Sequence, residues 1–135
     1  MSNWKNAERQ AAKLLGGTRR VRVMYSESCE DVHHTDYAIE VKYGGQVPKW
    51  VADVKRPVIL NDGLVLFKVG SGYCGWVMDT IYKKCKFIED GLKQASSYNP
   101  TKPALLVMKR RGQRGMVGCM YLTDWTTMDL YATVK

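Results

Sequence analysis

The sequence has no long apolar run. It has few cysteines, and its acidic residues are fewer than its basic residues. No segment approaches the ~20 consecutive apolar residues of a membrane span, and no secretory signal peptide is recognisable at the start. The four cysteines are widely spaced and form no Cys-x-x-Cys pair. A zinc site or a disulfide framework is therefore not expected, and a reducing, cytoplasmic environment is.

Basic residues outnumber acidic residues by 21 to 13, which gives a formal net charge of +8. Such an excess suits a phosphate-rich partner, although a protein that is simply basic is the alternative. The positive charge falls in three groups, which could follow a polyanion if the fold brings them to one side. The groups are Arg19, Arg20 and Arg22; Lys83, Lys84 and Lys86; and Lys109, Arg110, Arg111 and Arg114.

At 135 residues the chain is long enough for one domain with a real hydrophobic core. Apolar periodicity and turn residues predict helices over 4–15, 48–54 and 79–97. They predict strands over 19–25, 37–42, 102–110 and 115–123, and a hairpin over 58–69 that turns at Asn61-Asp62-Gly63. This order predicts an α+β fold with a central mixed β-sheet flanked by helices.

The two long predicted helices each have an apolar stripe. In the first helix, which Gly16-Gly17 should end, Glu8 borders or joins the stripe. Such a carboxylate is usually a capping residue, but it can also be a ligand that reaches inward. The stripes consist of Ala7, Ala11, Leu14 and Leu15 in the first helix, and of Ile81, Cys85, Ile88, Leu92 and Ala95 in the last.

The predicted strand at 37–42 places Glu40 and Lys42 on the same face, because side chains alternate between the faces of a strand. One interpretation is a solvated face with a cross-strand ion pair, worth about 0.2–1 kcal/mol. The other is an active site. A metal-dependent nuclease needs carboxylates to hold a divalent cation and a lysine to polarise the attacking water.

Such a site needs a further carboxylate, and two aspartates are candidates. On a straight strand Asp36 lies roughly 13 Å from Glu40, whereas ligands of one Mg²⁺ lie ~3–4 Å apart. Asp31 could come from a neighbouring antiparallel strand at ~4.5–5.5 Å. We therefore favour Asp31 and expect Asp36 to be a turn residue, unless the chain bends tightly at Tyr37.

Glu8, Asp31 and Glu40-Val41-Lys42 together resemble the E…D…ExK core of the PD-(D/E)XK nuclease superfamily, in particular archaeal-type and bacteriophage Holliday junction resolvases. The stretches "LGGTRRVRV", "EDVHH", "YAIEVKYGGQVPKW" and "LKQA" occur in the same order as in those nucleases. The resemblance covers residues 5–54 well and 84–110 loosely, and 55–80 look like an insertion. Glu30 occupies the position of the motif's proline.

The resemblance implies a restriction-endonuclease-like core and a Mg²⁺ site, at which Mn²⁺ could substitute. The implied metal ligands are Glu8, Asp31, Glu40 and the carbonyl of Val41.

The resemblance also implies roles for residues beside the metal. Lys42 would orient the nucleophilic water near the scissile phosphate. Gln94 is similar to a glutamine that supports such sites, with a plain surface residue as the alternative. Ser26 or Ser28 resembles a loop serine that approaches the phosphate.

The implied activity is symmetric nicking of four-way DNA junctions by a C2 homodimer, because a two-fold symmetric substrate needs two active sites. The basic groups would contact the DNA backbone rather than the bases. The location would be the host cytoplasm if a phage encodes the chain. The alternatives are a nuclease that acts on flaps, forks or duplex DNA, and a catalytically inactive nucleic-acid-binding module.

Other residues have weaker functional readings. His33-His34 is better explained as a turn pair than as a metal site, and Asp53-Val54-Lys55 as the end of a helix. Aromatic residues could stack on nucleobases, although packing in a core or interface is their commoner role. These residues are Trp50, Tyr73, Trp76 and Tyr82. The hairpin over 58–69 could pair two subunits if it projects from the fold.

Overall fold

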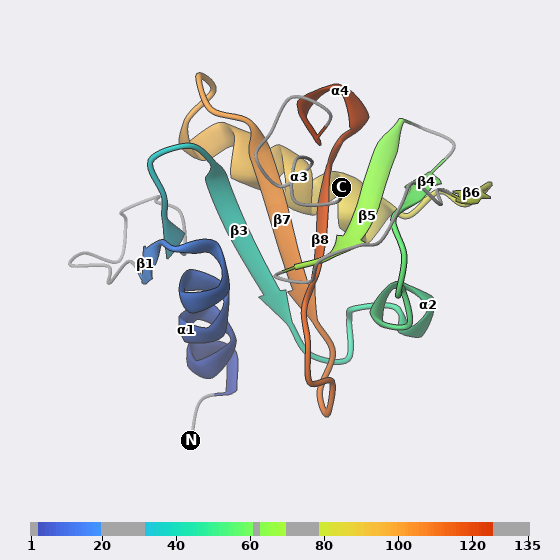
Figure 1. The fold of residues 1–135 in the computed structure, drawn as a ribbon, viewed down its shortest axis with the longest axis horizontal. Helices are drawn as coiled ribbons and strands as arrows, with labels where there is room; N and C mark the ends of the chain where they lie inside the picture. Colours follow the sequence, from blue (N-terminus) through green and yellow to red (C-terminus); the bar gives the residue numbers. More distant parts are fainter. Residues whose placement is uncertain (1–2, 20–31, 61–62, 70–78, 126–135) are drawn as a thin grey trace.

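The computed structural model describes residues 3–19, 32–60, 63–69 and 79–125 (Figure 1). Within these residues, strands from all parts of the chain form one mixed sheet in the order β1-β2-β3-β7-β8-β5-β4-β6. The strands are β1 Thr18–Arg19, β2 Val32–His33, β3 Ala38–Tyr43, β4 Val58–Leu60, β5 Leu64–Lys68, β6 Asp79–Ile81, β7 Ala104–Lys109 and β8 Val117–Tyr121. The helices are α1 Asn3–Leu15, α2 Lys49–Ala52, α3 Lys86–Tyr98 and α4 Leu122–Trp125.

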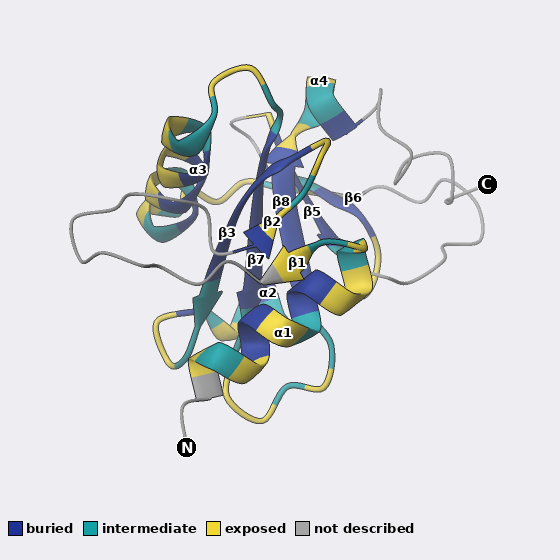
Figure 2. Ribbon diagram, turned by 90° about the vertical axis from the view of Figure 1, so that its left-hand side faces the viewer, coloured by how far each residue is buried: buried dark blue, intermediate teal, exposed yellow. Residues whose placement is uncertain are grey.

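Helices α1 and α3 cover opposite faces of this sheet, as the edge-on view in Figure 2 shows. The predicted α+β class, with a central mixed sheet flanked by helices, is therefore confirmed. None of the helices in the described part of the chain is long and apolar enough to cross a membrane.

The pairing of neighbouring strands changes from antiparallel to parallel between β3 and β7. Strands β1, β2 and β3 are joined by antiparallel ladders, whereas β3 and β7 are parallel, with Glu40 opposite Leu106 and Lys42 opposite Met108. Parallel neighbours need a crossover connection, and α3 lies in it. This connection also contains α2, β4, β5 and β6, and α3, its last element, packs over both β3 and β7.

The core has two layers, one on each face of the sheet. Leu105 and Val107 of β7 belong to the layer beneath α1, and Leu106 and Met108 belong to the layer beneath α3. Alternate residues of a strand point to opposite faces, so β7 is buried on both. Its uninterrupted apolar sequence "ALLVM" reflects this position.

The predicted hairpin over 58–69 does not project. Strands β4 and β5 pair with each other antiparallel, and β5 also pairs with β8 inside the sheet. Leu60, Leu64 and Leu66 are buried in the layer beneath α3. Without exposed apolar residues at a projecting hairpin, the reason to expect subunit pairing there is lost.

The prediction of one helix over 79–97 is wrong at its beginning. Residues 79–81 form β6, which pairs in parallel with β4, and α3 begins at Lys86. Ile81 is partly buried against the layer beneath α3, so its apolar character serves a strand. Lys83 and Lys84 consequently precede the helix, and Lys86 is its first residue.

Helix α1 confirms its predicted end but not all of its predicted stripe. Gly16 follows the helix with φ of +76°, a left-handed conformation that favours glycine. Ala7, Ala11 and Ala12 are buried, whereas Leu14 is 40% exposed. The apolar face of the helix is therefore centred on alanines, which allow a close approach to β3.

Candidate functional site

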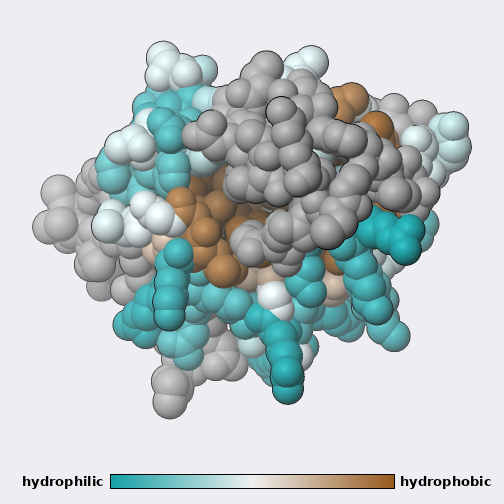
Figure 3. Space-filling view, viewed as in Figure 1, coloured by the Kyte–Doolittle hydropathy of each residue, from teal (hydrophilic) through white to brown (hydrophobic). Residues whose placement is uncertain are grey.

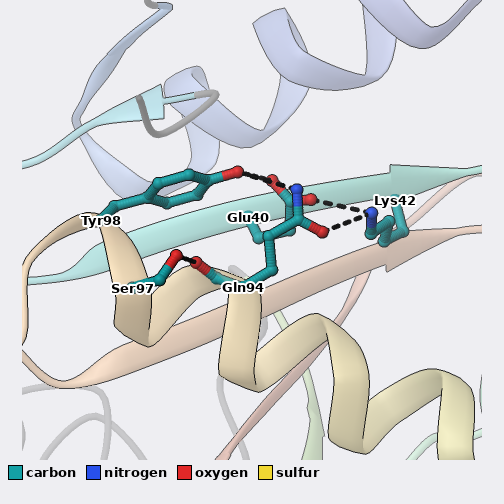
Figure 4. A network of polar contacts seen from close by, with 5 residues as sticks. All are labelled: Glu40, Lys42, Gln94, Ser97 and Tyr98. Atoms are coloured by element: carbon teal, nitrogen blue, oxygen red, sulfur yellow. Dashed lines mark hydrogen bonds and ion pairs between the residues drawn. The ribbon is translucent and has the colours of Figure 1, made fainter. Parts of the chain in front are cut away.

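The candidate site is a closed loop of polar contacts between β3 and α3 (Figure 4). Ile39 and Val41 of β3 belong to the layer beneath α1, so the alternating residues Glu40 and Lys42 face α3. Gln94 and Tyr98 lie one helical turn apart on α3 and therefore present their side chains to the same neighbour. The parallel β3–β7 pairing positions both elements.

Each side chain of the loop contacts the next. Lys42 Nζ lies 2.8 Å from Glu40 Oε2 and donates a hydrogen bond of 2.9 Å to Gln94 Oε1. Gln94 Nε2 donates to the Tyr98 hydroxyl at 2.9 Å. That hydroxyl donates to Glu40 Oε1 at 3.0 Å, which closes the ring.

The burial of Glu40 makes its two partners in this ring energetically important. The Glu40 side chain is only 3% exposed, whereas the Lys42 side chain is 31% exposed. A buried carboxylate is costly unless it is paired and hydrogen-bonded. Lys42 and Tyr98 engage its two oxygens, and the partial exposure of Lys42 leaves the ammonium accessible from solvent. Carboxylate oxygens of this kind are the donors that Mg²⁺ prefers.

Sequence reasoning selected Gln94 but missed Tyr98. Gln94 is exposed, as its alternative as a surface residue expects, and it also bonds to Lys42 and Tyr98 in the ring; its role at a site stays a prediction. The i, i+4 spacing of Gln94 and Tyr98 on one helix is the signal that could have identified the tyrosine. Ser97 adds a hydrogen bond of 2.6 Å from its hydroxyl to the Gln94 carbonyl.

The remaining predicted carboxylates occupy different positions. Glu8 is buried, 7% exposed, on α1, which packs against β3 from the opposite face of the sheet. Asp31 lies outside the described residues. It precedes Val32, which pairs with Ile39, the residue before Glu40. Among the residues that the structure describes, no three His, Cys, Asp or Glu side chains form a group that could hold a metal ion.

Asp36 occupies the connection between β2 and β3, as expected of a turn residue. It is exposed, and its backbone N–H donates to His34 Nδ1 at 3.0 Å. His34 Nε2 in turn donates to the Leu15 carbonyl at 2.9 Å. His34 thus ties the turn to the end of α1, and His33 ends β2, so the two histidines do not form a joint site.

The predicted basic group at 109–114 begins at the carboxyl end of β7, and its Lys109 faces α1, on the opposite face of the sheet from Lys42. Tyr43 is opposite Lys109 across the ladder, directly after the pairing of Lys42 with Met108. Gln10 of α1 accepts a hydrogen bond from Lys109 Nζ and donates one to the Arg114 carbonyl. The turn therefore bridges toward α1 while Arg111 and Arg114 remain exposed.

The hydrophilic lower edge of the molecule in Figure 3 coincides with this turn and with α2 in Figure 1. Arg110 Nη1 donates to the Val47 carbonyl at 3.0 Å, which joins the turn to the segment before α2.

The other predicted nucleic-acid contacts are only partly described. Arg19 lies in β1, and Lys83 and Lys84 are exposed before α3. The structure does not describe Arg20, Arg22, Ser26 or Ser28. Asp53 follows the last residue of α2 and is exposed, which confirms that Asp53-Val54-Lys55 marks a helix end.

Replacement of Lys42 by methionine should lower the free energy of unfolding by about 1–3 kcal/mol, because buried Glu40 then loses a charged partner. Urea denaturation followed by circular dichroism measures the change. Lys93→Met, at an exposed position on α3, is the matched control. Equal stability of the two variants would mean that the ion pair contributes nothing. The double variant Glu40→Gln/Lys42→Met should recover part of the loss.

Comparisons with protein-family models, curated proteins and solved structures find no match for this chain. Any assignment of function therefore depends on the motif and on the geometry described above.

Proposed function

We propose that this chain is a Mg²⁺-dependent endonuclease of the PD-(D/E)XK type, and most specifically a Holliday junction resolvase. The observation that carries the proposal is the ring of Glu40, Lys42, Gln94 and Tyr98. A buried carboxylate and a solvent-accessible ammonium are held side by side on a central strand. The motif identified three of these residues without knowledge of their contacts.

The proposed chemistry divides the residues into two groups. Asp31, Glu40 and the carbonyl of Val41 would hold Mg²⁺ or Mn²⁺. Bound there, the metal would supply activation of a water molecule and neutralisation of negative charge on the scissile phosphate. Glu8, which the motif also implies as a ligand, lies on α1 at the opposite face of the sheet, so this structure does not bring it next to Glu40.

The protein's own side chains would supply orientation and charge. Lys42, fixed by Glu40 and Gln94, would orient the attacking water and offset the negative charge of the scissile phosphate. Tyr98 would hold Glu40 in the orientation that a ligand needs. Preorganised groups of this kind lower the barrier because they need little rearrangement during the reaction.

The arrangement of the elements supports a restriction-endonuclease-like core. The proposed core contains α1, the antiparallel β1–β2–β3 unit, α3, and β7 parallel to β3. Residues 55–80 would be an insertion, whose described strands extend the sheet beyond β8. In this core Glu40 and Lys42 lie on an interior strand with a helix above them.

The charge distribution supports a DNA substrate. The exposed Arg111 and Arg114 belong to the turn that begins directly beside the end of β3. They could contact the phosphate backbone near the site, together with the basic groups at 19–22 and 83–86. Such contacts give affinity without reading sequence. A C2 homodimer would place two sites on a two-fold symmetric junction.

Incubation of the protein with an end-labelled mobile four-way junction and a matched linear duplex tests the proposal. We expect paired, symmetric nicks in the junction that require Mg²⁺ and disappear in EDTA. Equal cutting of both substrates would support a nuclease activity but contradict a preference for junctions. Binding without cutting in either Mg²⁺ or Mn²⁺ would instead indicate a catalytically inactive binding module.

A further inference from the structure

A second polar and aromatic site lies outside the Glu40 ring, beside α2. It is a pocket of about 300 Å³ lined by residues of α2, of the segment between α2 and β4, and of β4 and β6. The residues that line it are Trp50, Asp53, Val54, Lys55, Arg56, Val58 and Ile81.

One cation lies over the aromatic ring of this pocket, and two more belong to its lining. Lys83 Nζ lies 4.8 Å from the centroid of the Trp50 ring, and Lys55 and Arg56 are exposed on the lining. Next to Lys83 in the sequence, Tyr82 is 80% exposed, the largest exposure among the large hydrophobic residues that the structure describes.

We propose that this pocket binds an unpaired nucleotide of a DNA strand, with the base stacked on Trp50 in place of the Lys83 ammonium, which would move from the ring to a phosphate of the strand. Stacking on aromatic rings is tolerant of sequence because every base has a π face, and nearby cations hold the strand's phosphates. Lys55, Arg56 and Lys83 supply that charge. Asp53 can accept hydrogen bonds from the amino or imino groups of the base. The choice of DNA rests on the proposed function.

The pocket is located so that one DNA strand could occupy it and also pass the Glu40 ring. Val54 and Val58 belong to the core layer beneath α3, the face of the sheet on which Glu40 lies. Between the two sites, Gln113 of the basic turn donates to the Ala52 carbonyl at 3.5 Å. Figure 1 shows the turn and α2 at the same edge of the molecule. The basic turn is therefore in contact with the α2 region that carries the pocket, and a DNA strand bound in the pocket could extend along this turn.

Fluorescence anisotropy of two labelled probes in EDTA tests the pocket without cleavage. One probe is an oligothymidylate of about ten nucleotides, and the other is an abasic strand with the same number of phosphates. We expect the thymidylate to bind about tenfold more tightly. Equal affinities for the two probes would overturn the proposal, because charge alone would then account for binding.

Substitutions distinguish the contribution of the Trp50 side chain to binding from that of the basic side chains. Trp50→Leu keeps an apolar side chain against the core and should abolish the difference between the probes. Lys83→Ser and Arg56→Ser, at exposed positions, should weaken both probes, whereas the control Lys13→Ser on α1 should affect them much less. A Trp50→Leu variant that folds and still discriminates would also overturn the proposal.

The outcome is independent of cleavage. If the protein discriminates between the probes but never cuts a junction, the proposed pocket is supported and the proposed nuclease activity is refuted. If the protein cuts junctions but binds both probes equally, the proposed nuclease activity is supported and the proposed pocket is refuted.

Discussion

Replacement of Glu40 by glutamine, or of Lys42 by alanine, is expected to slow Mg²⁺-dependent DNA cleavage by at least about 10²–10³-fold, the effect of losing one preorganised electrostatic group. Glutamine removes the charge that a metal ligand needs and leaves Lys42 without its ion pair. Alanine removes the ammonium that would orient the water. Affinity for junction DNA should remain largely unchanged, because exposed basic residues elsewhere supply it.

Single-turnover cleavage of an end-labelled junction, with binding measured in parallel in Ca²⁺ or EDTA, separates the two effects. Asp90→Asn is the matched control, since it removes one negative charge from an exposed position on α3. It should cut at the normal rate. A Glu40→Gln variant that also cuts normally would refute the candidate site and leave the ring a purely structural feature.

The features that were predictable from the sequence have strong periodicity and local stop signals. The stretch "AIEVKY" alternates like a strand, and β3 occupies it. Gly16 ends α1 where the chain turns into its left-handed conformation. Strands β7 and β8 join through the Gly-containing basic turn. In each case the residues that set the local structure are contiguous, so no distant partner has to be known.

The features that were not predictable depend on distant partners. Ile81 continues the apolar spacing of α3, yet it pairs in a sheet because β4 offers a free edge that no local pattern reveals. Leu14 has the spacing of a core residue, but it is 40% exposed, and the buried residues of α1 are Ala7, Ala11 and Ala12 with Glu8. Tertiary contacts therefore override helical periodicity at both positions.

The residues of the candidate site that lie on a strand were predictable from the sequence. The position of the helix residues relative to that strand was not. Glu40 and Lys42 share a face because of the two-residue period of a strand alone. Tyr98 enters the ring only because α3 crosses β3 at a particular height and angle. The choice between Asp31 and Asp36 rested on distance along a strand, and the exposed turn position of Asp36 agrees with that reasoning.

The ring has two consequences that experiments must separate. It holds α3 against β3 through a buried charge, and it would also hold the reactive groups in place. Catalytic preorganisation and structural stabilisation therefore use the same hydrogen bonds. A loss of activity alone does not identify the chemistry, and stability must be measured for every variant of the ring.

Leu92→Ala should lower the free energy of unfolding by about 2–5 kcal/mol, which makes it the most destabilising substitution that we predict. Leu92 is 1% exposed on α3 and belongs to the core layer between this helix and the sheet. The adjacent Gly91 would place a Cβ only 2.8 Å from the side chain of Leu106, so the helix already lies close to β7 and cannot readily move inward to fill the space. A cavity would therefore remain, and its cost adds to the lost burial.

Urea denaturation of Leu92→Ala against the exposed Lys93→Ala measures this cost on the same helix. Because α3 carries Gln94 and Tyr98, the same variant should weaken the hold of the ring on Glu40 even at temperatures where the protein remains folded. Cleavage should then fall more than binding. If Leu92→Ala instead loses less than the control, α3 is not docked as described, and the ring that depends on it cannot be the origin of the activity.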